Sequence, residues 1–220
     1  MDSTFLSETN LFKGISPEAI TAMLPCLDAR TKSYKKEDCI FLAGDQIHEI
    51  GLVLSGSVNI VADFYWGTSH IFGHFEKGEI FAENYAAIPN KELPVSVIAA
   101  KDCEVLFLDM QKMMTTCQKV CASHQSLSKN LLMISAKKNL NLSSRMMHTA
   151  SKSIRGRLLS YLSEQAINHG SNKFQIPFNR QQLADYLAVD RSAMSNELSK
   201  MQKEGLIQFH KNEFVLNELS

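Results

Sequence analysis

The sequence predicts an α+β protein: an antiparallel β-roll, a long helix, and a C-terminal pair of short helices followed by a β-hairpin. From Tyr34 to Asp109, short apolar runs rich in Val, Ile and Phe alternate with glycines at positions 44, 51, 56, 67, 73 and 78, as antiparallel strands and tight turns do. The next glycine is Gly156, and the stretch from about Ser123 to Ser144 has the apolar spacing of a helix. Residues 179–207 read as two short helices joined by a turn.

The composition is that of a folded intracellular protein. A chain of 220 residues with 45% hydrophobic content can bury the cores of two modest domains. No apolar run is long enough to span a membrane, and the first residues, MDSTFLSETNLFKG, do not resemble a signal peptide, so we expect a cytoplasmic protein that does not contact membranes. The five cysteines are irregularly spaced, which favours free thiols over a disulfide framework.

The formal net charge of zero conceals a mild asymmetry between the two ends of the chain. From Arg145 onward there are 10 Lys and Arg against 7 Asp and Glu, and before it 13 against 16. The C-terminal part is therefore the basic one. An excess this small suits a domain that meets phosphate through a few placed side chains.

The N-terminal region begins with helices and continues as strands. Ser16, Pro17 and Glu18 form a helix start signal, with Ile20, Met23, Leu24 and Leu27 as the expected inner face. The apolar runs that follow Tyr34 are joined by links too short for parallel crossovers. A small barrel or β-roll is the natural way to close them.

The long helix carries an apolar stripe. Leu127, Leu131 and Ile134 repeat at four and then three residues, the spacing of a coiled-coil seam. We expect this seam to mediate homodimerisation, and the alternative is that the stripe packs on the β-domain of its own chain. Residues 143–153, rich in serine, are the expected hinge.

The C-terminal helix pair has clear start and stop signals. Asn179 caps the first helix, Asp190 caps the second, and Gly205 ends it. Ala188 occupies the turn, where glycine would adopt a positive φ more easily. The residues expected to face inward are Leu183, Ala184 and Leu187 in the first helix, and Met194, Leu198 and Met201 in the second. This pattern predicts a helix-turn-helix, and the segments LIQFH and EFVLN predict a hairpin wing after it.

The second helix of this pair has a polar face with short hydrogen-bonding groups. Its residues are Arg191, Ser192, Ser195, Asn196 and Ser199. Arginine can bind guanine through two hydrogen bonds and asparagine can bind adenine in the same way, so the face suits base recognition in a major groove. Arg180, in the first helix, is the first candidate for a phosphate contact. The alternative is an ordinary solvated helical hairpin.

The order of these parts, and several segments, resemble the Crp/Fnr transcription regulators. The segments are LVLSGSVNI at 52–60, KGEIFAE at 77–83, CEVLFLD at 103–109 and NRQQLADYLAVDRSAMSNEL at 179–198. The resemblance implies a β-roll like a cyclic-nucleotide-binding domain, a long dimerisation helix and a winged helix-turn-helix. The expected boundaries are 1–122 for the sensor with its N-terminal helices, 123–147 for the dimerisation helix and hinge, and 148–220 for the DNA-binding domain.

The resemblance also implies a function and its partners. It implies a homodimer that binds a near-palindromic operator in double-stranded DNA and works with RNA polymerase, controlled by an effector or redox signal sensed in the roll. By carry-over, Arg191, Ser192, Ser195 and Asn196 would face the bases and Arg180 a phosphate. Many relatives have a second arginine where this chain has Asn196, so its operator should differ from theirs. The alternative function is a ligand-binding or redox-sensing module without a specific DNA target.

The effector pocket departs from that of the cyclic-AMP-binding relatives. Those proteins pair a Gly-Glu with a later Arg-Ser, and the corresponding pairs here are Ala82-Glu83 and Leu93-Pro94. Without the arginine the strongest contact to a buried phosphate is absent, which disfavours cyclic AMP. An apolar or aromatic ligand is more compatible with the expected pocket residues, Glu83, Tyr85, Leu93 and Val95, together with Phe81 and Val97. A collapsed pocket, leaving a constitutive or thiol-regulated DNA binder, is the alternative.

Other candidate chemistry is weaker, and the effector and any cofactor stay unidentified. Cys26 stands nearly alone near the N-terminus, which disfavours the iron–sulfur branch of the family. Cys117 and Cys121, four apart, could sense oxidants or a soft metal, although buried thiols are commoner. His70 and His74, four apart in an expected strand, would share a face and could hold haem or metal, although paired surface histidines are commoner. No arrangement of catalytic residues is recognisable, so we expect neither an enzyme nor a metal site.

Overall fold

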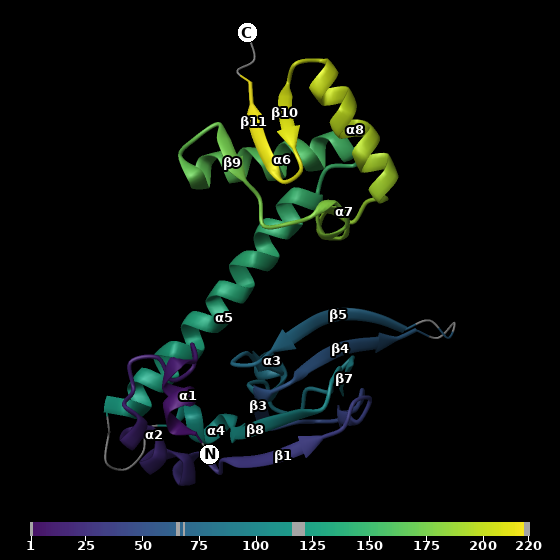
Figure 1. Ribbon diagram of the computed structural model, residues 1–220. Helices are drawn as coiled ribbons and strands as arrows, with labels where there is room; N and C mark the ends of the chain where they lie inside the picture. Colours follow the sequence, from purple (N-terminus) through teal and green to yellow (C-terminus); the bar gives the residue numbers. More distant parts are fainter. Residues whose placement is uncertain (1, 65–66, 68, 116–121, 218–220) are drawn as a thin grey trace. The chain divides into compact units, whose positions relative to one another are not determined.

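The computed structural model describes residues 2–64, 67, 69–115 and 122–217. It contains two compact units, residues 1–137 and 138–220, and each is described by itself. The long helix α5 (Ala122–Thr149) belongs in part to both units. Figure 1 shows the elements of each unit. None of the helices in the described part of the chain is long and apolar enough to cross a membrane.

The N-terminal unit begins with the expected helices. Its helices before α5 are α1 (Ser3–Glu8), α2 (Pro17–Met23), the 3-10 helix η1 (Leu24–Leu27), α3 (Glu83–Ala86) and α4 (Met110–Met114). The start signal for α2 is confirmed, because the hydroxyl of Ser16 accepts a hydrogen bond from the backbone N–H of Ala19. Ile20, Met23 and Leu27 are buried, as their spacing predicts.

Among the described residues of this unit, eight strands form the β-roll. They are β1 (Arg30–Tyr34), β2 (Cys39–Phe41), β3 (Glu49–Ser55), β4 (Ser57–Asp63), β5 (Ser69–Glu76), β6 (Ile80–Phe81), β7 (Ser96–Ala99) and β8 (Cys103–Asp109). They form two four-stranded sheets, in the orders β1-β8-β3-β6 and β2-β7-β4-β5, in which all pairs are antiparallel. Aromatic rings from both sheets meet inside the roll, where Phe41 contacts Phe81 and Phe107 edge to face. The predicted antiparallel roll is confirmed.

Helix α5 differs from its prediction at both its seam and its end. Leu127 and Leu131 are 0% and 6% exposed, and with Ile134 they pack into the core of the N-terminal unit. The prediction that this stripe forms the dimerisation seam is therefore wrong. The alternative holds, in which the stripe packs on the β-domain of its own chain. The expected hinge is also misplaced at its start, because the helix continues to Thr149. The serines at 143 and 144 do not interrupt it, since serine lowers helix propensity only slightly.

After the end of α5, the described part of the C-terminal unit combines helices with a small sheet. Its elements are α6 (Ile154–His169), β9 (Lys173–Gln175), α7 (Arg180–Leu187), α8 (Arg191–Lys203), β10 (Ile207–His210) and β11 (Glu213–Leu216). The hairpin of β10 and β11 is the predicted wing. Sequence reasoning missed β9, which pairs with β11 and buries only Phe174 of its three residues. The core of this unit lies between α6, α7 and α8 and includes Leu158, Leu183 and Leu198.

Candidate nucleic-acid interface

The first helix of the helix-turn-helix, α7, is locked at both ends. At its start, the side chain of Asn179 accepts from the N–H of Gln182, whose own side chain accepts from the N–H of Asn179. Such a reciprocal capping box satisfies two otherwise unpaired donors. At its end, Ala188 has a φ of +52°, the left-handed conformation expected from the sequence. The N–H of Val189 then returns to the carbonyl of Ala184, 3.0 Å away, which closes the turn into α8.

Helix α8 separates a buried stripe from an exposed polar face. Asp190 caps it by accepting from the N–H of Ala193 at 2.8 Å, and the three predicted inner residues, Met194, Leu198 and Met201, are 0% exposed. On the other side, Arg191, Ser192, Asn196 and Ser199 are exposed and Ser195 is half-buried. The structure therefore places the five predicted base-facing side chains together on the outer surface of one helix.

The exposed head groups on this face are available to a ligand. Among the described residues, neither the guanidinium of Arg191 nor the amide of Asn196 has a hydrogen-bond or ion-pair partner. The hydroxyls of Ser195 and Ser199 donate to the carbonyls four residues earlier, at 2.9 and 3.0 Å, which leaves their lone pairs free to accept. The face can thus offer both donors and acceptors to the edges of bases.

The side chain of Arg180 packs against the hairpin wing. Its guanidinium carbon lies 4.7 Å from the ring centre of Phe209 and 5.3 Å from that of Phe214. The side chain is half-buried, and this burial lowers the pKa of Arg180 from its ordinary value, although an arginine stays charged at any physiological pH. A guanidinium that packs against two aromatic rings has little freedom to turn, so its donors point in a restricted direction. The aromatic partners lie about 30 residues away in sequence, so sequence reasoning did not find this contact.

Two further arginines, both missed by sequence reasoning, hold the helix-turn-helix against α6. Arg157 donates from Nη1 to the carbonyls of Leu187 and Ala188, 2.9 Å from each. Arg155 forms a fork on Glu204, with both contacts at 2.8 Å, and reaches Glu197 at 2.6 Å. These contacts fix the turn, the middle of α8 and its C-terminal end. Bidentate arginine–carboxylate pairs are specific in geometry as well as strong, so α8 is held as a rigid element.

Of the four expected effector residues, two are buried in the N-terminal unit and two are half-buried. Glu83 begins α3 and is 3% exposed, and Ala82 before it has a φ of +67°, a left-handed conformation that favours glycine. Leu93 is 3% exposed, while Tyr85 and Val95 are half-buried. Leu93 and Tyr85 belong to one core cluster.

Phe81 and Val97 belong to a second core cluster and are 0% and 1% exposed. Four of the residues expected around Glu83 are thus divided between two packed clusters. A ligand among them would have to displace side chains that now fill the core.

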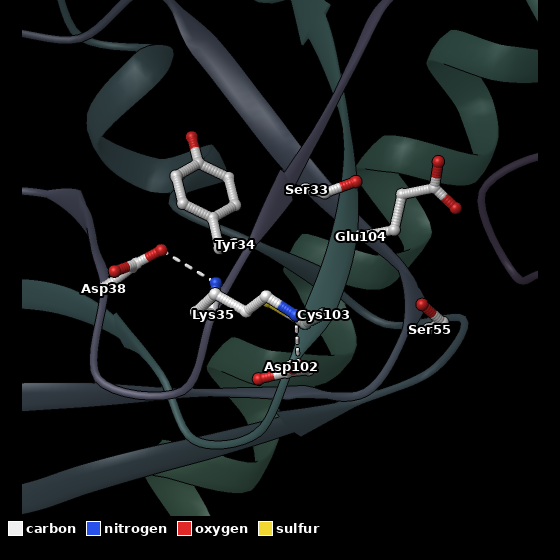
Figure 2. Close-up of a pocket in the computed structure, with 8 residues that line it drawn as sticks. All are labelled: Ser33, Tyr34, Lys35, Asp38, Ser55, Asp102, Cys103 and Glu104. Atoms are coloured by element: carbon white, nitrogen blue, oxygen red, sulfur yellow. Dashed lines mark hydrogen bonds and ion pairs between the residues drawn. The ribbon is translucent and has the colours of Figure 1, made fainter.

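A hollow of about 390 Å³ lies on the roll at the end of β1 and the start of β8. Figure 2 shows its lining residues, which are Ser33, Tyr34, Lys35, Asp38, Ser55, Asp102, Cys103 and Glu104. Its charges are largely paired, since Lys35 Nζ lies 2.8 Å from Asp102 Oδ2 and the N–H of Lys35 donates to Asp38. The contact with Asp102 raises the pKa of Lys35, and the same contact lowers the pKa of Asp102. The contact between Lys35 and Asp102 joins the turn after β1 to the turn before β8, so we assign these groups a structural role.

The histidine pair predicted on β5 is separated by a bulge. His74 pairs with Asn59 and His70 with Ala62, because the register shifts between Ile60 and Val61. Asn59 and Ala62 are three apart on β4 and point to opposite faces, so the prediction that His70 and His74 share a face is wrong. No group of three or more potential metal ligands occurs in the part of the chain that the structure describes. Cys117 and Cys121 lie outside the described residues.

Comparison with known proteins agrees with both units. The model of the cyclic nucleotide-binding domain matches residues 31–120, and that of the Crp-like helix-turn-helix domain matches residues 156–219. The CRP-like protein Clp of Xanthomonas campestris pv. campestris (strain B100) is 25% identical over 197 residues, covering 84% of this chain and 83% of its own. The same protein of Xanthomonas axonopodis pv. citri is 24% identical over the same lengths.

Solved structures share the fold at low identity. The c-di-GMP-responsive global regulator CLP of Xanthomonas campestris has a TM-score of 0.54 at 19% identity, covering 93% of this chain and 100% of that one. The catabolite activator protein of Thermus thermophilus has a TM-score of 0.50 at 22% identity, covering 96% and 94%. With a matching sensor domain, a matching helix-turn-helix domain and relatives that span most of its length, this chain belongs to the Crp/Fnr family of DNA-binding transcription regulators.

Proposed function

We propose that the protein acts as a homodimer in the cytoplasm and reads a near-palindromic operator with the polar face of α8. The observation that carries this proposal is that the five predicted base-facing residues lie together on a helix clamped by Arg155 and Arg157. A rigid reading helix suits direct recognition, because base contacts need fixed donor and acceptor positions. RNA polymerase is the expected protein partner.

Different side chains of α7 and α8 would contact the bases and the phosphates. Arg191 is suited to guanine, through O6 and N7, and Asn196 to adenine, through N6 and N7. Ser192, Ser195 and Ser199 would hydrogen-bond to neighbouring bases, because a hydroxyl can donate or accept. Arg180, held on the rings of the wing, would bind a phosphate and fix the register without reading sequence.

A different face of α5 from the predicted one supports dimerisation. Leu132, Met133, Leu140, Met146 and Met147 are between 60% and 70% exposed. Met133, Leu140 and Met147 recur every seven residues, with the exposed Ala136 between the first two, which is the repeat of a coiled-coil seam. Large apolar side chains rarely stay exposed in such a row. We call Met133, Ala136, Leu140 and Met147 the α5 seam.

The test of DNA recognition is a gel shift at several salt concentrations on promoter fragments from the source organism. We expect tight binding to a small subset, with half-sites about 34 Å apart. Arg191→Ala or Asn196→Ala should relax base preference at one or two positions of each half-site by about 1–3 kcal/mol. Arg180→Ala should weaken binding to all sequences alike.

Two results would count against this proposal. Absence of tight binding to any fragment would favour the alternative, a ligand-binding or redox-sensing module without a DNA target. Altered sequence preference in Arg180→Ala but not in Arg191→Ala would mean that the roles of α7 and α8 are reversed.

We further propose that cyclic AMP is not the effector. The place of the relatives' Arg-Ser is taken by Leu93, which is 3% exposed, and Pro94, which has no N–H. A buried phosphate would then lack its cation and its donors. Calorimetric titration with cyclic AMP and cyclic GMP should detect no binding. Micromolar binding would show that another cation, such as the exposed Lys91, replaces the arginine.

An apolar or aromatic effector stays a prediction. Native mass spectrometry of the purified protein would detect a ligand that co-purifies with the chain. If it detects none, the packing of Phe81 and Val97 supports the alternative of a filled roll, controlled through thiols or not controlled at all.

A further inference from the structure

Three phenylalanines form an aromatic ladder across the small sheet of the C-terminal unit. Phe209 on β10 lies opposite Phe214 on β11, and Phe214 lies opposite Phe174 on β9. Their ring centres are 5.9 and 6.3 Å apart, and the ring planes are inclined by 30° and 15°. Residues directly opposite each other on antiparallel strands are close neighbours on one face of the sheet, so each ring supports the next. We call these three residues the wing ladder.

The two inner rings of the wing ladder anchor the outer one. Phe214 and Phe174 are 0% and 5% exposed and belong to the core of the unit. Phe209, on an edge strand of the sheet, packs against that core and is half-buried. The ring of Phe209 is therefore held by its neighbours, while part of its surface lies outside the core.

Arg180 packs against the outer part of the wing ladder without an anion to balance its charge. Its guanidinium carbon lies 4.7 Å from the ring centre of Phe209 and 5.3 Å from that of Phe214. Among the described residues, the guanidinium has no ion-pair or hydrogen-bond partner, and burial alone lowers the pKa of Arg180. Arg180 is also the first residue of α7, where the positive end of the helix dipole disfavours a cation. A guanidinium in this position is available to an anion from outside the chain, such as a phosphate.

We propose that Phe209 is a positioning residue for operator binding, which through the wing ladder holds the guanidinium of Arg180 in place for a phosphate of the DNA backbone. This inference rests on the proposed operator binding and adds to it a role for the wing. A long side chain that is already restricted loses less conformational freedom when it binds, so its contact is stronger than that of a freely rotating arginine. Because the phosphate carries no sequence information, the gain applies to every operator alike.

The test is a double-mutant cycle in the full-length protein, with the substitutions Phe209→Leu and Arg180→Ala. Leucine keeps an apolar side chain in the wing but removes the aromatic ring. Fluorescence anisotropy would measure affinity for the promoter fragment that binds tightest in the gel shifts, and for a version of it with one base pair changed in each half-site. Each affinity is measured at several salt concentrations, and chemical unfolding checks that every variant is folded.

We expect Phe209→Leu to weaken binding about two- to tenfold for each half-site, or about 4- to 100-fold for the full operator. The loss should be the same for both DNA sequences, and the salt dependence of affinity should match that of the wild type, because Arg180 keeps its charge. Arg180→Ala should make the salt dependence shallower, by a slope of about one for each half-site. Adding Phe209→Leu to Arg180→Ala should change affinity no further. Phe209→Tyr, which keeps an aromatic ring, should bind as the wild type does.

The matched control is Leu216→Ala. Leu216 is a half-buried residue of the wing that packs on the same core as Phe209. Its truncation should change affinity by the same factor with and without Arg180, as a purely structural change in the wing would. The proposal is overturned if Phe209→Leu follows this additive pattern, or if Phe209→Tyr binds as weakly as Phe209→Leu.

A second readout separates this inference from the proposed function. If no DNA fragment is bound tightly, the proposed function fails, and NMR relaxation of the Arg180 Nε–H group still tests the positioning role. The order parameter of this group should be high in the wild type and in Phe209→Tyr, and lower in Phe209→Leu. Equal order parameters in the three proteins would overturn the positioning role, whether or not DNA is bound.

Discussion

Replacing Leu140 by alanine tests the α5 seam. Leu140 is 67% exposed within one chain, so its truncation should leave the stability of the protomer nearly unchanged. In the dimer, full burial of a leucine side chain contributes about 1.5–3 kcal/mol, so burying the exposed two thirds contributes about 1–2 kcal/mol. In a two-fold symmetric dimer each residue occurs twice in the interface, so the substitution removes this contribution twice. We therefore expect Leu140→Ala to weaken dimerisation by about 2–4 kcal/mol, or about 30- to 700-fold in the dimer dissociation constant.

The matched control is Leu131→Ala on the same helix. Leu131 is 6% exposed and packs in the N-terminal core, so its truncation should destabilise that unit by about 2–5 kcal/mol. It should weaken the dimer little while the unit is folded. Sedimentation equilibrium measures the dimer constant, and chemical unfolding measures the stability of each variant. The reasoning is refuted if Leu140→Ala leaves the dimer constant unchanged, or if Leu131→Ala weakens the dimer without lowering stability.

Three further substitutions test the packing of the two units by chemical unfolding. Ala188→Gly should stabilise the C-terminal unit by about 0.5–1 kcal/mol, because relief of the left-handed strain at φ +52° exceeds the added entropy of the unfolded chain; a loss would show that Ala188 is unstrained. Tyr161→Phe should also stabilise this unit, by about 1 kcal/mol, since the Tyr161 hydroxyl is buried without a hydrogen-bond partner among the described residues. A destabilised Tyr161→Phe would reveal a partner for that hydroxyl. Gly51→Ala should destabilise the N-terminal unit by about 1–3 kcal/mol, because a Cβ there would lie 2.1 Å from the ring of Phe81, and wild-type stability would mean that the ring moves aside.

Much of the fold follows from local signals in the sequence. Caps such as Ser16, Asn179 and Asp190 act within one helical turn, so the sequence is sufficient to find them. The punctuation of the strands by glycine is local too. The polar face of α8 could be predicted because one helix determines which of its residues lie side by side. The left-handed turn at Ala188 could be predicted as well, because it lies between two helices whose ends have local signals.

Features that depend on contacts between residues distant in sequence could be found only from the tertiary structure. Spacing identifies an apolar stripe on α5, but it does not show whether the core of the same chain or a second chain covers it, and Leu131 proved to be core while Leu140 is exposed. A bulge that one register shift creates put His70 and His74 on opposite faces.

The same limit applies to the candidate site. Arg180 meets its aromatic partners about 30 residues away, and Arg157 meets the carbonyls of Leu187 and Ala188 at a similar separation in sequence. Periodicity and capping report on neighbours within about four residues. The sequence alone therefore determined most of the elements and the polar face of α8, while tertiary packing determined which side chains support that face and which surface of α5 remains exposed.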